Sequence, residues 1–128
     1  MKKIIYTADA PAPIGPYSQA VEANGMLFVS GQIAIDPATG EIVQGDIESE
    51  TRQVLDNLKA ILDARGLNFD HVVKSTVFVA DMHQFAAINA IYAEYFTGDQ
   101  PPARETVQAA ALPKFVNIEI SVIAVINE

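Results

Sequence analysis

Apolar residues recur with two different periods along the chain, which predicts helices in some segments and strands in others. Between residues 47 and 65 they follow the helical repeat, with polar residues in the positions between them. Asp46 is a suitable N-cap for this helix, and Gly66 is a suitable C-cap. A second helical segment, 82–96, follows Asp81. Its apolar face carries Phe85, Ile88, Tyr92 and Phe96.

Six other segments are rich in β-branched and apolar residues, which is typical of strands. They cover residues 2–6, 18–23, 26–33, 71–80, 104–111 and 116–126. Asn24-Gly25 joins the second segment to the third, and this dipeptide is the strongest short-range signal for a β-hairpin. The last two segments are expected to pair around Leu112-Pro113. The predicted order is β-β-β-α-β-α-β-β, an α+β fold with both helices on one face of a mixed sheet.

Length and composition indicate a single globular domain over residues 1–128. Half of the residues are hydrophobic, only 19% are charged, and the mean hydropathy is +0.19. A sheet with both helices on one face leaves its other face uncovered. Because a small domain with so few charges has apolar surface to hide, we expect copies of the chain to cover that face.

The chain is acidic, with 16 Asp and Glu residues against 8 scattered Lys and Arg residues and a net charge of −8. This balance argues against binding to nucleic acids or to anionic membranes. Without cysteine, the chain has no disulfide, thiol nucleophile or thiolate metal site. No apolar run suffices for a signal-peptide core or a membrane span, so we expect a soluble cytoplasmic protein.

One carboxylate interrupts the last apolar strand, VNIEISVIAVI. Alternation places Ile118 and Ile120 on one face of this strand, and Asn117 and Glu119 on the other. Because isolated burial of an ionised carboxylate is costly, Glu119 must be solvated, paired, protonated or catalytic. Two interpretations stay open: a solvated strand end beside Asn117, or a functional acid or base.

Arg104 is the second unusual charge. It follows Pro-Pro-Ala and precedes a predicted strand, whereas Arg52 and Arg65 lie on or at the end of the first helix. A guanidinium on such a rigid approach can bind a carboxylate through two parallel hydrogen bonds. The alternative is an ordinary ion pair at the surface or between subunits.

The remaining polar residues carry little information singly. His71 and His83 have no partner at metal-ligand spacing, and Ser30 in VSGQ lacks the context of a nucleophile elbow. The sequence contains no phosphate-binding loop and no dinucleotide-binding motif. We therefore expect neither a metal nor any other cofactor.

Several motifs taken together are specific enough to indicate a family. They are IGPYSQA (14–20), FVSGQI (28–33), KSTVFVADM (74–82), INAIYAEYF (88–96), and PPARETVQAAALP followed by NIEI. By these motifs the chain resembles the Rid family of reactive-intermediate imine deaminases, also called YjgF-type proteins, and most closely the RidA branch. The resemblance runs from about residue 2 to 126. It implies a chorismate-mutase-like α+β fold and a homotrimer with a central barrel and ligand clefts between neighbouring subunits.

The resemblance also implies an activity and a site. Small 2-imino acids and their enamine tautomers, such as 2-aminoacrylate, would be hydrolysed to 2-keto acids and ammonia without a cofactor. Arg104 would bind the substrate carboxylate and keep Glu119 ionised, and Glu119 would position or activate the attacking water. The other implied site residues are Tyr17, which lines the pocket, Ser30, Gly31 and Thr106, which supply polar or backbone contacts, and Asn89, which lies near the cleft. We expect Arg104 and Glu119 to converge on one small anion in a cleft that a neighbouring chain completes.

Two positions depart from the family pattern. Glu105 stands where most members have a small residue, and Thr106 stands where several have cysteine. Alternation points Glu105 away from Arg104, unless a bulge in the strand lets it occupy the guanidinium. The alternatives to an imine deaminase are a non-catalytic sensor or chaperone that binds small carboxylates, and a ribonuclease, which the charge of −8 disfavours.

Overall fold

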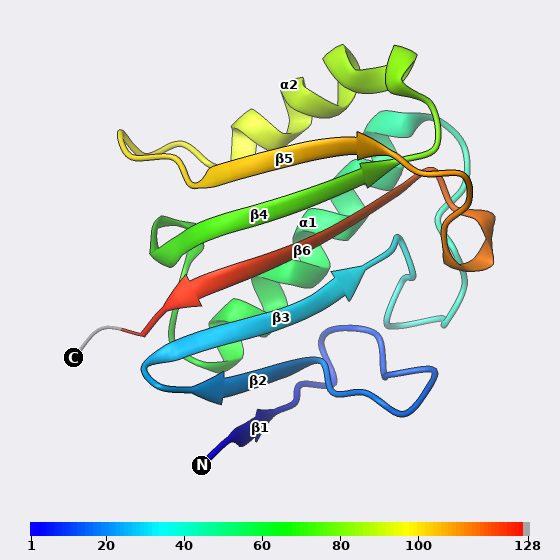
Figure 1. Ribbon diagram of the computed structural model, residues 1–128. Coiled ribbons are helices and arrows are strands. Elements are labelled where there is room, and N and C mark those ends of the chain that lie inside the picture. Colours follow the sequence, from blue (N-terminus) through cyan, green and yellow to red (C-terminus); the bar gives the residue numbers. More distant parts are fainter. Residues whose placement is uncertain (127–128) are drawn as a thin grey trace.

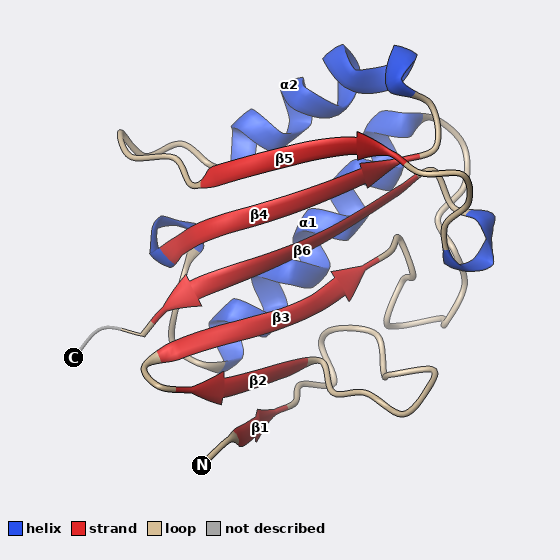
Figure 2. Ribbon diagram, in the orientation of Figure 1, coloured by secondary structure: helices blue, strands red, loops and turns tan. Residues whose placement is uncertain are grey.

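Two helices cover one face of a six-stranded sheet in the computed structural model, which describes residues 1–126 (Figure 1). Helices α1 (Ile47–Ala64) and α2 (Phe85–Tyr95) pack against each other on the same side of the sheet and leave its opposite face without a helix (Figure 2). The strands are β1 (Lys3–Ile5), β2 (Ala20–Ala23), β3 (Met26–Gln32), β4 (Val72–Val79), β5 (Ala103–Gln108) and β6 (Ile118–Val125). This order of elements confirms the predicted α+β fold.

The strands lie in the order β1-β2-β3-β6-β4-β5. All neighbouring strands are antiparallel except β4 and β5, which run parallel, so the sheet is mixed as predicted. The last strand of the chain, β6, therefore lies in the middle of the sheet, between β3 and β4. β5 forms one edge of the sheet, and β1 forms the other.

The expected pairing of the two final strands is wrong, because β4 lies between them. Val79, the last residue of β4, is in register with Gln108 at the end of β5 and with Ile118 at the start of β6. The connection between them passes over the end of β4 and contains the short helix η3 (Pro113–Phe115). A central strand needs hydrogen-bond partners on both sides, and β4 obtains one from each of the last two segments.

The local signals at the ends of the elements are confirmed. The Asp46 side chain accepts a hydrogen bond of 2.7 Å from the Ser49 amide and thereby caps α1. Gly66, with φ +75°, follows the end of this helix in the left-handed region. Asn24 and Gly25 both have positive φ, 52° and 73°, as a two-residue hairpin turn of type I′ requires.

The core lies between the helices and the sheet. On β6 the side chains alternate as predicted: Ile118 and Ile120 are fully buried, whereas Glu119 and Ile123 on the other face are only partly buried. That other face also carries Phe28, which is in register with Ile123. The prediction that further copies of the chain cover this apolar face follows from its composition and stays a prediction.

Candidate functional site

Glu119 lies in a pocket on the face of the sheet that has no helix. The pocket has a volume of about 330 Å³, and its walls come from the loop between β1 and β2, from the end of β3 and the segment after it, and from η3. The lining residues are Pro11, Ala12, Ile14, Tyr17, Gln19, Ser30, Gly31, Gln32, Ile33, Ile35, Pro113 and Glu119. Four of the predicted site residues thus share one pocket: Tyr17, Ser30, Gly31 and Glu119.

A bulge in β3 brings the backbone of Gly31 against the Glu119 carboxylate. The register between β3 and β6 shifts by one residue between Val29 and Gln32, so the extra residue bends β3 beside the pocket. A Cβ atom at Gly31 would overlap Oε2 of Glu119. Only glycine therefore leaves room for the carboxylate in this position. The neighbouring Ser30 binds the loop between β1 and β2, since its Oγ donates a hydrogen bond of 2.5 Å to the Ser18 carbonyl.

The carboxyl group of Glu119 is half-buried and has no hydrogen-bond or ion-pair partner among residues 1–126. Burial alone raises its pKa above the ordinary value of 4.5. Asn117 does not share this environment, because its side-chain amide donates to Oε1 of Glu50 at 2.9 Å. The position of Glu119 thus differs from the fully solvated strand end of the simpler interpretation. A carboxyl group with a raised pKa in a partly apolar pocket is a candidate acid or base.

Tyr17 reaches the same pocket from the loop between β1 and β2. Its ring is partly exposed, and its hydroxyl accepts a hydrogen bond of 3.3 Å from the Ile14 amide. The Tyr17 amide in turn donates to the Gly15 carbonyl at 2.9 Å. These local bonds hold the phenol as a wall of the pocket, and the role of Tyr17 toward a substrate stays a prediction.

Arg104 lies in a different place, between β5 and α2. Its Nη1 donates a hydrogen bond of 2.8 Å to Oδ1 of Asn89. Its guanidinium carbon lies 4.7 Å from the centre of the Tyr92 ring and 5.5 Å from that of Phe85, within the range of cation–π contacts. A shallow pocket of about 430 Å³ beside it is lined by Asn89, Tyr92, Ala93, Phe96, Pro101, Pro102 and Arg104.

Arg104 differs from the other two arginines in having no carboxylate partner within the described part of the chain. Arg52 pairs with Glu94 at 2.7 Å, and Arg65 pairs with Glu22 at 2.6 Å. The Arg104 guanidinium is instead held by an amide oxygen and two aromatic rings, which leave its charge uncompensated. Such a cation is available to an external anion.

Arg104 and Glu119 do not converge within one chain. Arg104 is in register with Ser75 on β4, whose hydroxyl lies 2.6 Å from that of Tyr92 on α2, so both residues face the helices. Glu119 is in register with Phe78 on β4, three positions further along, and faces the opposite side. The expectation that the two charged groups of one chain face one anion is not met.

Thr106 lies on the same face as Arg104, because the two residues are two positions apart on β5. Its hydroxyl oxygen is buried and has no hydrogen-bond partner in the described residues. A buried hydroxyl without a partner is unusual and is compatible with a contact made by a bound ligand. The structure thus brings Arg104, Asn89 and Thr106 to the helix side of β5, apart from the Glu119 pocket.

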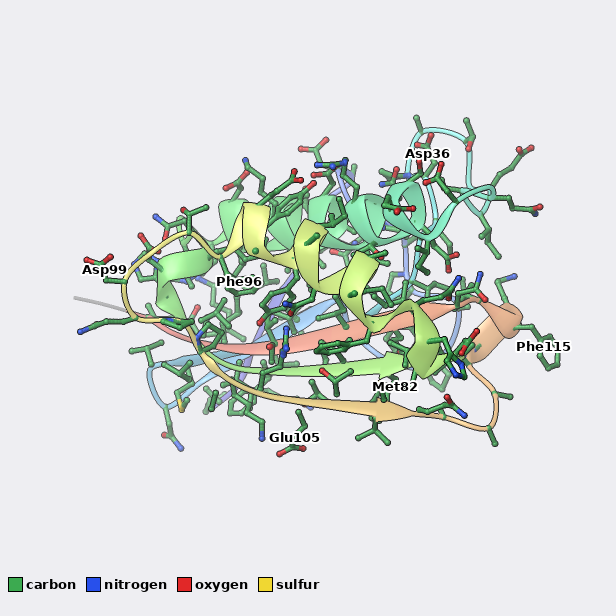
Figure 3. The ribbon with its side chains drawn as sticks, turned by 90° about the horizontal axis from the view of Figure 1, so that it is seen from above. Asp36, Met82, Phe96, Asp99, Glu105 and Phe115 are labelled. Carbon is green, nitrogen blue, oxygen red and sulfur yellow. The ribbon has the colours of Figure 1, made fainter. Side chains whose placement is uncertain are left out.

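Glu105 points away from Arg104, as predicted. The register between β4 and β5 is continuous from Lys74–Ala103 to Val79–Gln108, so no bulge turns Glu105 toward the guanidinium. Its carboxylate lies 3.1 Å from Nζ of Lys74. Figure 3 shows Glu105 on the side of the sheet opposite the helices. The departure from the family pattern therefore leaves Arg104 unneutralised.

The sequence did not reveal every residue around these groups. Periodicity assigns Phe85 and Tyr92 only to the packing face of α2, and nothing in it shows that both rings also contact Arg104. Ile33 and Ile35 line the Glu119 pocket from a segment beyond the regular strand. Their alternate spacing after SGQ is the one signal that could have placed them on a common face.

Metal chemistry finds no support in the arrangement of ligands. Within residues 1–126, no three His, Cys, Asp or Glu side chains cluster closely enough to hold a metal ion. His83 is exposed and pairs with Asp81 at 2.9 Å.

Across residues 1–126, neither helix combines the length and the apolar character that a membrane crossing would require.

Comparison with known proteins gives consistent matches over the whole chain. A family model described as endoribonuclease L-PSP matches residues 7–126. A RutC family protein of Pyrococcus horikoshii is 57% identical over 97% of this chain and 98% of its own length. The 2-iminobutanoate/2-iminopropanoate deaminase of Mus musculus is 48% identical over 98% of this chain and 92% of its own length.

Solved structures resemble the fold equally closely. A protein of the conserved Rid family from Yersinia pestis has a TM-score of 0.96 at 49% identity, covering 98% of this chain and 100% of its own. The E. coli protein TdcF with bound serine has a TM-score of 0.91 at 46% identity, covering 98% and 99% respectively. The fold around the two groups of candidate residues is therefore shared with both of these solved structures.

Proposed function

Because the chain belongs to the Rid family, as its motifs predicted, we propose that it hydrolyses small 2-imino acids and their enamine tautomers to 2-keto acids and ammonia. The observation that carries the proposal is the half-buried Glu119 carboxyl, which has a raised pKa and lies in a pocket of about 330 Å³. The name of the mouse relative, 2-iminobutanoate/2-iminopropanoate deaminase, supports the same reaction. The serine bound to TdcF supports a small amino-acid-like ligand.

The complete site forms between two copies of the chain in the proposed homotrimer. One chain supplies the Glu119 pocket, and its neighbour supplies Arg104 with Asn89 and Thr106. β5 is an edge strand, so Arg104 lies at the rim of the sheet, where another chain can meet it. The apolar sheet face around Phe28 and Ile123 gives the neighbour a surface to cover.

Arg104 binds the carboxylate of the imino acid through charge-assisted hydrogen bonds. Asn89 engages only Nη1, so the remaining guanidinium N–H groups stay available to the ligand. The Tyr92 and Phe85 rings restrict the guanidinium and reduce the entropy lost on binding. Anchoring the carboxylate also orients the imine carbon toward the carboxyl group of the neighbouring chain's pocket, which lowers the entropic barrier to attack.

Glu119 acts as the base and then as the acid. It accepts a proton from water while the water oxygen bonds to the imine carbon, and it returns this proton to the imine nitrogen to give a carbinolamine. Glu119 then accepts the proton of the carbinolamine hydroxyl and transfers it to the nitrogen as the C–N bond breaks, which leaves a 2-keto acid and ammonia. General base catalysis by a positioned carboxylate is worth about 10²–10⁴-fold, which suffices for compounds that already hydrolyse in water. The reaction requires no cofactor.

Charge favours this function over the nuclease activity in the family model's description. The chain has a net charge of −8, with its eight basic residues scattered along the sequence, so it offers no basic surface to a phosphate backbone. A small monoanion requires only one free guanidinium, and Arg104 provides it.

The test is a coupled assay in which an amino-acid oxidase or a dehydratase generates 2-iminobutyrate or 2-aminoacrylate. Wild-type protein should accelerate formation of the 2-keto acid, whereas Glu119→Gln and Arg104→Ala should not. Arg52→Ala serves as the control, because it removes an exposed arginine that is paired with Glu94. The proposed function is lost if wild-type protein has no effect on the rate. Binding of a 2-keto acid without any effect on the rate would instead identify a carboxylate-binding sensor.

A further inference from the structure

We propose that two buried amide side chains, Gln19 and Asn57, are positioning residues that hold the walls of the Glu119 pocket and thereby set its affinity for substrate. The proposal rests on the function proposed above, since it assigns the substrate to this pocket. Both residues are almost completely inaccessible, with 2% and 1% of their surfaces exposed. Amide groups in such positions require hydrogen-bond partners, and all but one of the partners found here are backbone groups of irregular segments.

Gln19 ties together the two ends of the loop between β1 and β2. Its Oε1 accepts a hydrogen bond of 2.8 Å from the Thr7 amide. Its Nε2 donates to three carbonyl oxygens, those of Thr7 at 3.0 Å, Ala10 at 3.3 Å and Pro11 at 2.9 Å. A compact loop whose ends meet is an Ω-loop, and this one lines the pocket with Pro11 and Tyr17. One side chain therefore fixes the first part of the loop, residues 7–11, against the end of the loop beside the pocket.

Asn57 holds the segment that follows β3. Its Nδ2 donates to the carbonyl oxygens of Ile33 at 3.1 Å and of Ile35 at 3.0 Å, and both isoleucines line the pocket. Its Oδ1 accepts a hydrogen bond of 2.9 Å from the Gln53 side chain. Asn57 stands on the core-facing side of α1 next to the fully buried Leu58. A polar residue at such a position departs from the helix pattern, and such departures are expected at functional sites.

The two amides act on the walls of the pocket and leave the reacting group in place. Glu119 belongs to β6, which is paired on both sides in the middle of the sheet, so its position does not depend on either amide. The segments 7–12 and 33–35 lie outside the named strands and lack such a ladder. Loss of an amide should therefore weaken ground-state and transition-state binding equally. That change raises KM and spares kcat.

The test uses changes that keep the size of the side chain but replace its N–H donors by a carboxylate oxygen, Gln19→Glu and Asn57→Asp. A carboxylate there would face carbonyl oxygens, so the local bonds should break. We expect KM for 2-iminobutyrate to rise at least about tenfold, with kcat changed less than about threefold, because uniform binding is lost. Amide hydrogen exchange should accelerate about tenfold or more in residues 7–12 for the first variant and 33–36 for the second, with β4 and β6 unchanged.

Three further measurements make the outcome decisive. Asn68→Asp is the matched control, because it changes an amide to an acid at a 3-10 helix cap away from the pocket and should alter neither KM nor local exchange. Gln19→Met and Asn57→Leu replace the charged variants if those do not fold. Pyruvate binding, measured by calorimetry, should weaken in the same variants even if the wild-type protein proves inactive, which separates this proposal from the proposed function. Unchanged pyruvate affinity together with unchanged loop exchange would overturn it, as would an equal acceleration of exchange throughout the chain.

Discussion

Arg104 and Glu119 lie on opposite faces of one sheet, on strands that β4 separates. Arg104 faces the helices beside Asn89 and Tyr92, whereas Glu119 faces a pocket on the side without helices. No rotation of side chains brings these groups together around one small molecule within a single chain. Catalysis by this pair would therefore require two copies of the chain, and the proposed site would take one group from each.

Chains that carry different half-site mutations should complement each other. Arg104→Ala and Glu119→Gln chains, each inactive alone, can be unfolded, mixed in equal amounts and refolded together. In a cyclic trimer every mixed assembly contains one intact site, so random mixing restores about one quarter of the wild-type sites. The imine-decay assay measures the recovery. A mixture as inactive as its components would show that the two residues do not belong to one site.

The pH dependence of the reaction should reflect the raised pKa of Glu119. Because burial disfavours the carboxylate, the active base is lost on acidification at a higher pH than for a solvated glutamate. kcat/KM should therefore fall as the pH drops through this raised pKa. In the inactive Arg104→Ala variant the pKa of Glu119, followed by NMR titration of its carboxyl group, should lie still higher, because the neighbouring guanidinium that favours the carboxylate is absent. A wild-type acid limb at the ordinary glutamate pKa, together with a Glu119 pKa that is the same in Arg104→Ala, would contradict the assignment.

Gly31→Ala should lower kcat about a hundredfold without unfolding the domain. The added methyl group would overlap Oε2 of Glu119, so the carboxylate must leave its position. A displacement of about 1 Å at the reacting group costs on the order of a hundredfold in kcat. Gly15→Ala is the matched control, because its Cβ would lie 3.6 Å from the Tyr17 ring, an ordinary contact. Equal activity of both variants would show that the position of the carboxylate is not critical.

Glu105→Ala should leave the reaction almost unchanged. Glu105 pairs with Lys74 on the face opposite Arg104, and exposed ion pairs of this kind contribute little. We expect kcat/KM within about twofold of wild type and a small change in thermal stability. A large increase in substrate affinity would mean that Glu105 competes for the Arg104 guanidinium in the assembled protein.

Local sequence signals predicted the elements of the fold but not the neighbours in the sheet. Asp46, Gly66 and Asn24-Gly25 act through bonds and dihedral angles within a few residues, so the sequence near them is sufficient. The partners of a strand depend instead on the path of the chain, which β-branched composition does not encode. The expected pairing of the last two strands is therefore wrong, and Arg104 and Glu119 do not converge on one anion within a single chain.

The sequence predicted the candidate site only in part, because some of its residues act on segments that are distant in the chain. Family motifs pointed to Glu119, Tyr17, Ser30 and Gly31, and these do share one pocket. Gln19 and Asn57 escaped notice because each acts through backbone carbonyls of a remote segment, up to 24 residues away in sequence for Asn57. The sequence shows such a role only as a polar residue at a position where the pattern predicts a buried apolar residue.

The Arg104 guanidinium, held by Asn89 and the aromatic rings without an acid partner, makes the choice of buffer anion important. No internal acid within residues 1–126 screens the Arg104 guanidinium, so chloride, sulfate or acetate in a buffer competes for it with the substrate. Preparations in different salts would then differ in apparent activity although every molecule is correctly folded. Simple anions should therefore act as weak competitive inhibitors, because an unpaired guanidinium binds them as well as the substrate carboxylate.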